Sequence, residues 1–228
     1  MFYQGPSNIG GAPIVGIATF NTKNLKTGPM IQTWILCQYR NPFQAAQYKE
    51  DYAVCGDCPL RNNGCYVRTS EAPYRIWNLW KDGYYHPYDR YKAMFCAKGR
   101  TVRLGAYGDP AALPLWSITD LLSYSTGHTG YTHQWRWANH LKPYCMASVE
   151  SMKDYALAKA MGWRTFRIRP EGGKRIKHTE AQCPAALKSE QVLNCHQCLA
   201  CGGNSQGFTG DVSIEVHGVI RGRVFNEK

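Results

Sequence analysis

The sequence predicts an α/β fold built on a mainly parallel sheet, because short apolar strand patterns alternate with helix patterns of about 10–15 residues. About six strand patterns follow one another, at residues 30–36, 102–108, 130–135, 144–149, 164–169 and 212–218. A partial (βα)6 barrel and an open doubly wound sheet both fit this order. Neither G-x-G-x-x-G nor G-x-x-x-x-G-K-[ST] occurs at a strand–helix junction, so a standard dinucleotide or P-loop site is not expected.

The two clearest helices are predicted from apolar spacing and from glycine stops. Residues 113–127 carry leucine and isoleucine at helical spacing before a glycine. Residues 150–162 form the other helix, which ends at Gly162. Its expected apolar face consists of Met152, Tyr155, Ala156 and Ala160. Residues 13–20 are predicted as a further strand near the front of the chain.

The composition indicates a folded protein of the cytoplasm. No linker or composition break divides the 228 residues, so we expect a single domain. No apolar run approaches the roughly 18 residues of a membrane span, and the first twenty residues lack the pattern of a signal peptide. In a reducing compartment, ten cysteines in tight spacings favour metal sites over disulfides.

The charge balance is basic, with a formal net charge of +11. Two four-thiolate sites, each around zinc or a 4Fe–4S core of charge 2+, would contribute about −2 each and lower this value to about +7. A basic chain attracts anionic partners, but the charge alone does not identify them.

The densest cysteine pattern lies in residues 183–203, CPAALKSEQVLNCHQCLACGG. Cys195, Cys198 and Cys201 form a C-x-x-C-x-x-C run, a spacing of bacterial ferredoxins in which a more distant cysteine completes a cluster. Cys183 is the candidate for that distant ligand. The pattern favours an iron–sulfur cluster over zinc, because structural zinc usually takes ligands from two separate knuckles. A loop without metal is the third alternative.

A second cysteine set lies upstream. Cys55 and Cys58 form a knuckle, Cys65 follows six residues later, and Cys37 comes directly after a predicted strand. In a parallel α/β protein, ligands and cofactors gather at such strand ends. Iron–sulfur and zinc are nearly balanced alternatives for this set.

Polar residues recur at the ends of the predicted strands, namely Asp109 in a Gly-Asp-Pro turn, His133, Ser148 and Glu150. Each has a simple structural explanation, such as an Asx turn for Asp109 or a satisfied core residue for His133. Their recurrence at successive strand ends favours a common pocket, because one rim of a parallel barrel collects these ends.

The densest basic stretch is RTFRIRPEGGKRIKH, in which alternation along the strand directs Phe166 and Ile168 inward. A solvated strand edge and loop is the favoured interpretation, and a phosphate-binding surface for nucleic acid is the alternative. The residues of that candidate surface are Arg164, Arg167, Arg169, Lys174, Arg175 and Lys177.

Together these features resemble the radical SAM (S-adenosylmethionine) superfamily. A cysteine group follows the first of the six strands, Gly-Asp-Pro ends the second, and the α/β pattern repeats about six times. In particular, the chain looks like small phage- and plasmid-encoded barrel proteins related to that superfamily. The matching segments span residues 31–218 and are CPLRNNGCYV, RLGAYGDP, GYTHQW, CMASVES, FRIR and the cysteine-rich tail.

The resemblance implies a partial (βα)6 TIM-like barrel of parallel strands with two cysteine-rich metal-binding loops. Residues 31–182 would form the barrel with a metal site at its mouth, residues 183–203 an auxiliary cluster loop, and residues 211–217 the last strand. Each site would hold a 4Fe–4S cluster, with zinc as the alternative. The mouth ligands would be Cys37, Cys55, Cys58 and Cys65, and the auxiliary ligands Cys183, Cys195, Cys198 and Cys201.

The resemblance also makes S-adenosylmethionine a candidate cofactor. The turn Tyr107, Gly108, Asp109 and Pro110 would be the counterpart of the superfamily's turn that contacts the methionine amine, and Ser148 and Glu150 would lie near the ribose. Against this cofactor stands the absence of the superfamily's C-x-x-x-C-x-x-C motif. A fourth thiolate from Cys37 would also close the iron that the cofactor needs.

The expected function is redox or radical-type chemistry at the barrel mouth, with a nucleotide or nucleic acid as the candidate substrate. Asp109, His133 and Glu150 are the expected catalytic residues lining the pocket. The alternative is a non-catalytic binding protein, stabilised by zinc or iron–sulfur, that contacts nucleic acid or a host protein through the basic stretch. If the chain is phage-encoded, the expected location is the cytoplasm of the host cell.

Overall fold

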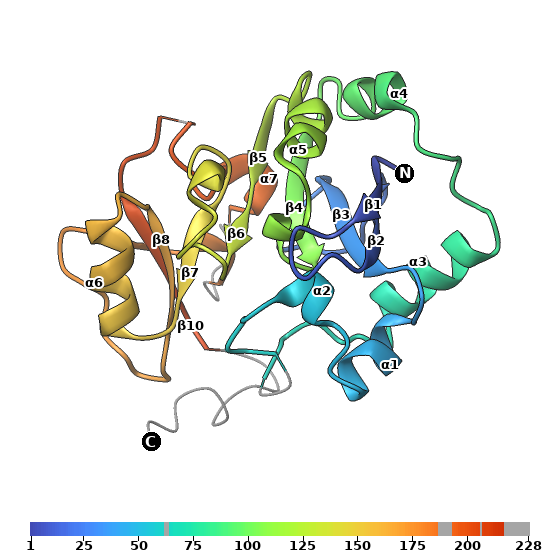
Figure 1. Cartoon of the computed structure of the whole chain (residues 1–228). Helices are drawn as coiled ribbons and strands as arrows, with labels where there is room; N and C mark the ends of the chain where they lie inside the picture. Colours follow the sequence, from blue (N-terminus) through green and yellow to red (C-terminus); the bar gives the residue numbers. More distant parts are fainter. Residues whose placement is uncertain (62–63, 187–192, 206, 217–228) are drawn as a thin grey trace.

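The computed structural model of the chain describes residues 1–61, 64–186, 193–205 and 207–216. The strands in these ranges form two five-stranded sheets, in the orders β1-β2-β3-β4-β5 and β6-β7-β8-β10-β9 (Figure 1). The first sheet consists of β1 (Tyr3–Pro6), β2 (Pro13–Thr19), β3 (Ile31–Cys37), β4 (Thr101–Tyr107) and β5 (Gly127–Thr129). The second consists of β6 (Tyr131–Thr132), β7 (Met146–Val149), β8 (Thr165–Arg169), β9 (Glu180–Gln182) and β10 (Asp211–Glu215).

The predicted α/β class with parallel strands is confirmed. Strands β3, β4 and β5 pair in parallel, as do all neighbouring strands of the second sheet. The segment 13–20 is a strand, β2, but it pairs antiparallel with β1 and β3 and so adds an antiparallel edge to the first sheet. The described strands do not close into a barrel. Residues 187–192 of the predicted cysteine loop and residue 217 of the predicted last strand lie outside the described residues.

The two sheets meet at Gly130, the single residue between β5 and β6. The Gly130 amide donates to the carbonyl of Cys201 at 3.0 Å, and its carbonyl accepts from the Met146 amide at 2.9 Å. A Cβ atom here would lie 2.8 Å from the sulfur of Cys145, so the close approach requires glycine. This residue therefore joins β5 to β6 along the chain, bonds to the start of β7, and ties the cysteine-rich segment to the junction.

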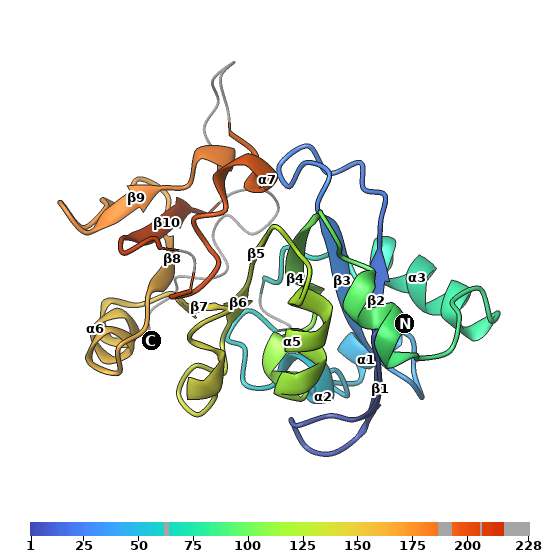
Figure 2. The same ribbon diagram turned by 90° about the horizontal axis from the view of Figure 1, so that it is seen from above.

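The helices lie in the connections between the strands. Four helices occupy the long connection from β3 to β4, and they are α1 (Pro42–Gln47), α2 (Tyr52–Cys55), α3 (Ala72–Lys81) and α4 (Arg90–Phe95). The others are α5 (Leu115–Leu122), α6 (Met152–Ala160) and α7 (Cys195–Cys198). In the view of Figure 2, α5 and α7 lie on opposite sides of β4 and β5, and α6 lies beside β7 and β8. Helix α6 packs against these two strands.

The largest group of buried side chains surrounds the first sheet and reaches to β7, with Trp135, Trp163 and Ile118 among its fully buried members. Helix α6 contributes little to it, because Ala158 is its buried residue and Met152 is 54% exposed. The predicted helix is confirmed, but its predicted apolar face is wrong. The helix packs through a small residue and anchors through Tyr155 and Lys159, which hydrogen-bond the buried Asp211 at 3.1 Å each.

Candidate metal centres and the pocket between them

The C-terminal cysteines are presented by the short helix α7. Asn194 caps it with a reciprocal pair of bonds, since its side chain accepts from the Gln197 amide at 3.0 Å and its own amide donates to the Gln197 side chain at 3.1 Å. Leu199 then adopts a left-handed conformation with φ 51°, which ends the helix. This local structure places Cys195, Cys198 and Cys201 in one tight turn of the chain.

The four predicted auxiliary cysteines lie within electrostatic reach of one another around Cys201, and we call them the auxiliary set. The thiol of Cys201 interacts electrostatically with Cys183, Cys195 and Cys198. Cys183 reaches this position because its amide donates to Ser213 of β10 at 2.9 Å. Burial raises the pKa of Cys183 to about 11 and raises that of Cys201 further. Thiols of this kind ionise readily only beside a cation, and their spread over several positions suits an iron–sulfur cluster, in which each thiolate binds a different iron.

Two residues from the strands support the auxiliary set. The hydroxyl of Tyr131 hydrogen-bonds the thiol of Cys201. The guanidinium of Arg103 lies within electrostatic reach of Cys195 and donates to the hydroxyl of Tyr66 at 3.0 Å. Both a hydrogen bond and a positive charge favour thiolates over thiols.

The structure groups three of the four predicted mouth cysteines, and we call Cys55, Cys58 and Cys65 the mouth set. Cys55 ends helix α2 and interacts electrostatically with Cys58 and Cys65. The Cys37 thiol has other partners, because its sulfur lies 3.8 Å from the carbonyl oxygen of Glu50 and hydrogen-bonds Tyr39. Burial raises the pKa of Cys37 to about 11. Three thiols thus form the mouth set, and the fourth lies beside it.

The knuckle of the mouth set is held by Gln134, a residue that the sequence did not single out. Its side-chain amide donates to the Cys55 carbonyl at 3.1 Å, and its carbonyl oxygen accepts from the Asp57 amide at 3.4 Å. Gly56 between them has φ 55°, and a Cβ atom there would lie 2.6 Å from the Gln134 amide. The end of β6 therefore fixes the backbone that carries the first two cysteines.

The Gly-Asp-Pro turn holds the knuckle from the other side. The amide of Asp109 donates to the carbonyl of Val54 at 2.6 Å, one residue before Cys55. The Asp109 carboxylate accepts from the hydroxyl of Thr132 at 2.7 Å and from the amide of His133 at 2.8 Å. Burial raises the pKa of Asp109, and its hydrogen bonds offset part of that effect. Asp109 is therefore a positioning residue that joins the mouth set to β6.

The His133 side chain links the mouth set to Glu150. Its Nε2 atom lies 2.8 Å from Oε1 of Glu150, and the imidazole also hydrogen-bonds Cys58. Burial lowers the pKa of His133, but the bonds to Cys58 and Glu150 outweigh it, so the pKa is raised well above its usual value. The connection of Glu150 to the mouth set therefore runs through His133, and Glu150 does not line the cavity described below.

Tyr107, at the end of β4, holds a buried hydroxyl within electrostatic reach of Cys55, Cys37 and Cys65. Its side chain is 4% exposed, and its hydroxyl has no hydrogen-bond partner within the described ranges. Burial raises its pKa well above 10, and the neighbours that add to this effect include Cys55 and Cys65. A buried hydroxyl without a partner is rare in folded proteins. A sulfur-bearing group at the mouth set would accept its hydrogen bond, which is a second indication that a metal group fits here.

Among the described residues, no three or more His, Cys, Asp or Glu side chains meet closely enough to hold a single metal ion. A single zinc ion requires its sulfur ligands at about 2.3 Å from one point. In a cluster, by contrast, each thiolate binds a different iron.

A cavity of about 270 Å³ lies between the two cysteine sets. His133 and Gly64, the neighbour of Cys65, line it from the mouth side, and Cys183 and Cys195 line it from the auxiliary side. Of the other predicted strand-end residues, Ser148 also contributes to the wall. Phe166 and Ile168 line this cavity but are only partly buried, whereas Arg167 and Arg169 on the other face of β8 are buried, so the predicted inward face of this strand is wrong. The described wall contains two thiols of the auxiliary set, and it approaches the mouth set through His133 and Gly64.

The predicted basic surface is divided by the structure. Arg164 donates to the carbonyls of Ala200, Gly203 and Gly210. Arg167 pairs with Glu180 at 2.5 Å, and Arg169 donates to Gln182 at 2.6 Å. All three arginines are buried, so the interpretation of a solvated strand edge is wrong for them. Three of the six candidate phosphate-contact residues therefore make their hydrogen bonds inside the protein.

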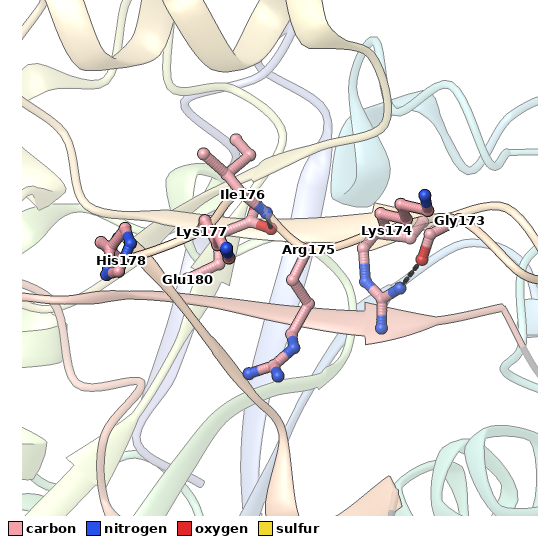
Figure 3. A pocket seen from close by; sticks show the side chains of 8 residues that line it. Gly173, Lys174, Arg175, Ile176, Lys177, His178 and Glu180 are labelled. Carbon is pink, nitrogen blue, oxygen red and sulfur yellow. Dashed lines mark hydrogen bonds between the residues drawn. The ribbon is translucent and has the colours of Figure 1, made fainter.

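The remaining cations, Lys174, Arg175 and Lys177, are exposed on the loop after β8. They line a second hollow of about 370 Å³, which also includes His178 and Glu180. Figure 3 shows the side chains of Lys174 and Arg175 pointing away from each other rather than toward a common centre. This loop offers scattered positive charge instead of a formed anion site.

No helix in the described part of the chain combines the length and the apolar character needed to cross a membrane. Comparison of the chain with protein-family models, with curated proteins and with solved structures found no match in any of the three.

Proposed function

We propose that this chain is a cysteine-ligated iron–sulfur protein that carries out redox or radical-type chemistry in the cavity between its two cysteine sets. The observation that supports this most strongly is the grouping of Cys55, Cys58 and Cys65 without Cys37. Three thiolates would leave one iron of a 4Fe–4S cluster without a protein ligand, next to the cavity. An iron of this kind can take a substrate or an exchangeable cofactor such as S-adenosylmethionine.

The strand arrangement favours a radical-SAM-like partial barrel. Parallel neighbours follow one another in the orders β3-β4-β5 and β6-β7-β8-β10. Gly130 joins β5 to β6 along the chain, so these two short strands count as one. Six parallel strands in that order, curved around one cavity, correspond to a (βα)6 arrangement that does not close. The mouth set lies in the connection that follows β3, at the carboxyl end where such folds place their chemistry. Helix α7 of the auxiliary set lies instead at the amino ends of the first sheet, where His196 contacts Thr101 of β4 and the Cys195 amide donates to the carbonyl of Lys26, which precedes β3.

The residues around the mouth set have separable roles. Gln134 and Asp109 hold the knuckle through its backbone. His133 hydrogen-bonds Cys58 and is itself held by Glu150, so it stabilises the thiolate form of that ligand. Tyr107 supplies a further hydroxyl donor. A bound 4Fe–4S cluster would supply one-electron chemistry, with a potential set in part by these hydrogen bonds.

The auxiliary set has four thiols and no equivalent open position. Its ligands would be Cys183, Cys195, Cys198 and Cys201, with Tyr131 and Arg103 as their neighbours. Full ligation suits a cluster that exchanges electrons or holds the fold rather than one that binds substrate.

Metal analysis of protein purified without oxygen tests the proposal. We expect a brown protein with roughly eight irons and a similar amount of acid-labile sulfide per chain, as for two 4Fe–4S clusters. Calorimetry with S-adenosylmethionine then tests the open iron, and binding is expected in the iron-loaded protein but not after chelation. A colourless protein with about two zinc ions per chain would overturn the iron–sulfur assignment.

A second candidate is a non-catalytic, metal-stabilised protein that binds nucleic acid or a host protein. The exposed loop with Lys174, Arg175 and Lys177 favours it. Changing these three residues to glutamine should then weaken nucleic-acid retention. The dependence of affinity on salt concentration should also become shallower, because fewer phosphates are neutralised by the protein. Because Arg167 and Arg169 are buried, their substitution would test stability rather than binding.

A further inference from the structure

Arg103 brings a charged group into the middle of an otherwise largely apolar cavity. It lies at the centre of the first sheet, since β4 pairs with β3 through Gln32 and with β5 through Thr129 at this position. Its side chain lines the cavity between the two cysteine sets. The guanidinium is held in place by the hydroxyl of Tyr66, which also lines the cavity, at 3.0 Å.

Arg103 forms no ion pair with a carboxylate in the described structure. A guanidinium stays charged at any physiological pH, so this positive charge persists inside the cavity. Lys26 adds a second cation to the lining. Of the lining acids, Glu215 accepts a hydrogen bond from the Gly172 amide at 3.1 Å. The imidazole of His133 is occupied by Glu150.

The opposite wall is apolar and aromatic. The rings of Tyr131 and Phe166 lie 4.4 Å apart, centroid to centroid, and both line the cavity. Ile168, Ile214 and Val216 extend the same wall. A cavity with few convergent polar groups on one side and apolar contacts on the other is the usual form of a small-molecule site.

We propose that the cavity binds a small organic anion, with its carboxylate or phosphate on Arg103 and its flat or apolar body against Tyr131 and Phe166. Arginine recognises carboxylates and phosphates alike through paired hydrogen bonds, so the structure indicates a negatively charged oxygen group that either class of ligand supplies. A volume of about 270 Å³ limits the ligand to roughly the size of a mononucleotide or smaller. The inference deepens the proposed function, on which it rests for the chemistry that follows binding.

The nearest alternative role for Arg103 is that of a counter-ion to the auxiliary set, because the guanidinium lies near Cys195. The two roles make different predictions. A counter-ion stabilises the metal site whether or not a ligand is present, whereas a ligand anchor changes ligand affinity and leaves the metal content unchanged.

Equilibrium dialysis on the anaerobically purified protein separates these roles. The probes are adenosine monophosphate, adenosine, inorganic phosphate and benzoate. We expect adenosine monophosphate or benzoate to bind, adenosine to bind more weakly, and inorganic phosphate to compete only at higher concentration. Binding of the monophosphate but not of benzoate assigns the phosphate, and the reverse assigns the carboxylate.

Arg103→Gln should lower the affinity for the probe by about tenfold or more, because it removes a charge-assisted contact. Tyr66→Phe removes the hydroxyl that holds the guanidinium and changes an exposed ring, so it provides a variant that keeps the fold and weakens binding by a few-fold. Arg175→Gln, in the exposed loop, is the matched control and should bind as the unchanged protein does. Iron and zinc contents are measured for every variant.

The inference is overturned if no probe binds the unchanged protein, or if Arg103→Gln and Tyr66→Phe bind as tightly as it does. Loss of metal in Arg103→Gln without any change in probe affinity in Tyr66→Phe assigns Arg103 as a counter-ion and also overturns it. An iron-loaded protein that binds no anion leaves the proposed function standing. A zinc protein that binds anions through Arg103 overturns the proposed function and leaves this inference standing.

Discussion

The Nε2 atom of His133 lies 2.8 Å from Oε1 of Glu150, and the same imidazole hydrogen-bonds the thiol of Cys58. Glu150 follows strand β7, His133 follows strand β6, and Cys58 belongs to the connection after β3. One side chain therefore joins three loops at the mouth set. Orientation of a metal ligand by an outer hydrogen bond is a common feature of metal sites.

This relationship predicts that His133→Ala weakens metal retention at the mouth set. Outer-shell substitutions typically reduce metal affinity by about 10–100-fold. We expect iron to leave the mouth set faster in the presence of a chelator, while the auxiliary set keeps its iron. His140→Ala, on the exposed face of the protein, is the matched control. Equal chelation rates for the two variants would show that His133 does not support the site.

Substitution of Tyr107 should change a different quantity in each metal state of the protein. Its buried hydroxyl lacks a partner when no metal group is present, so Tyr107→Phe should raise the free energy of unfolding of the metal-free protein by about 1 kcal/mol. In the iron-loaded protein the same change removes a hydrogen bond to the sulfur atoms, and the reduction potential of the mouth cluster should become more negative. Chemical unfolding and redox titration measure the two effects.

Tyr131→Phe is the control for this experiment, because its hydroxyl bonds Cys201 of the auxiliary set. It should leave the potential of the mouth cluster unchanged and shift that of the auxiliary cluster. If Tyr107→Phe moves neither quantity, its hydroxyl has no acceptor at the mouth set.

The buried pair of Arg167 and Glu180 predicts a pH dependence of stability. Burial raises the pKa of Glu180, but the hydrogen bonds from Arg167 outweigh it and the pKa is lowered in the folded state. The pair therefore stabilises the protein above the ordinary glutamate pKa of about 4.3, and this contribution is lost as the pH falls through the lowered folded value. Glu180→Gln leaves Arg167 buried without its counter-charge, which should cost about 3–5 kcal/mol at pH 7.

Unfolding in denaturant between pH 7 and pH 3 measures this difference, which should shrink toward the acid end. Glu71→Gln is the control, since the Arg68–Glu71 pair is exposed and its loss should leave the free energy of unfolding nearly unchanged at every pH. A Glu180→Gln deficit that stays constant across this range would contradict the assignment of the ionised pair.

Much of the fold could be predicted from the sequence because strand patterns and glycine stops are local signals. The helix α3 was not predicted, although Gly83 with φ 75° directly follows its C-cap. The antiparallel pairing of β2 was also not predicted, because it depends on which strand lies beside it. The burial of Arg167 could not be predicted either. Alternation along β8 defines two faces, and only the position of Glu180, 13 residues later, shows that the charged face is covered.

The candidate sites, like the fold, could be predicted only in part. The spacing of Cys195, Cys198 and Cys201 predicted one group, and the structure places them together with Cys183. For the upstream cysteines the sequence offered four candidates, and the structure groups three of them. The role of Gln134 rests on backbone atoms of Cys55 and Asp57, which lie nearly eighty residues earlier, so no pattern around Gln134 indicates it.

Iron and sulfide content in cysteine variants tests the central claim most directly. In Cys58→Ala and in Cys198→Ala, we expect iron per chain to fall by about half, as one of two 4Fe–4S clusters is lost. In Cys37→Ala we expect the full content, because the Cys37 thiol lies with Tyr39 and Glu50 rather than with the mouth set. Loss of as much iron in Cys37→Ala as in Cys58→Ala would contradict the three-cysteine site with an open iron.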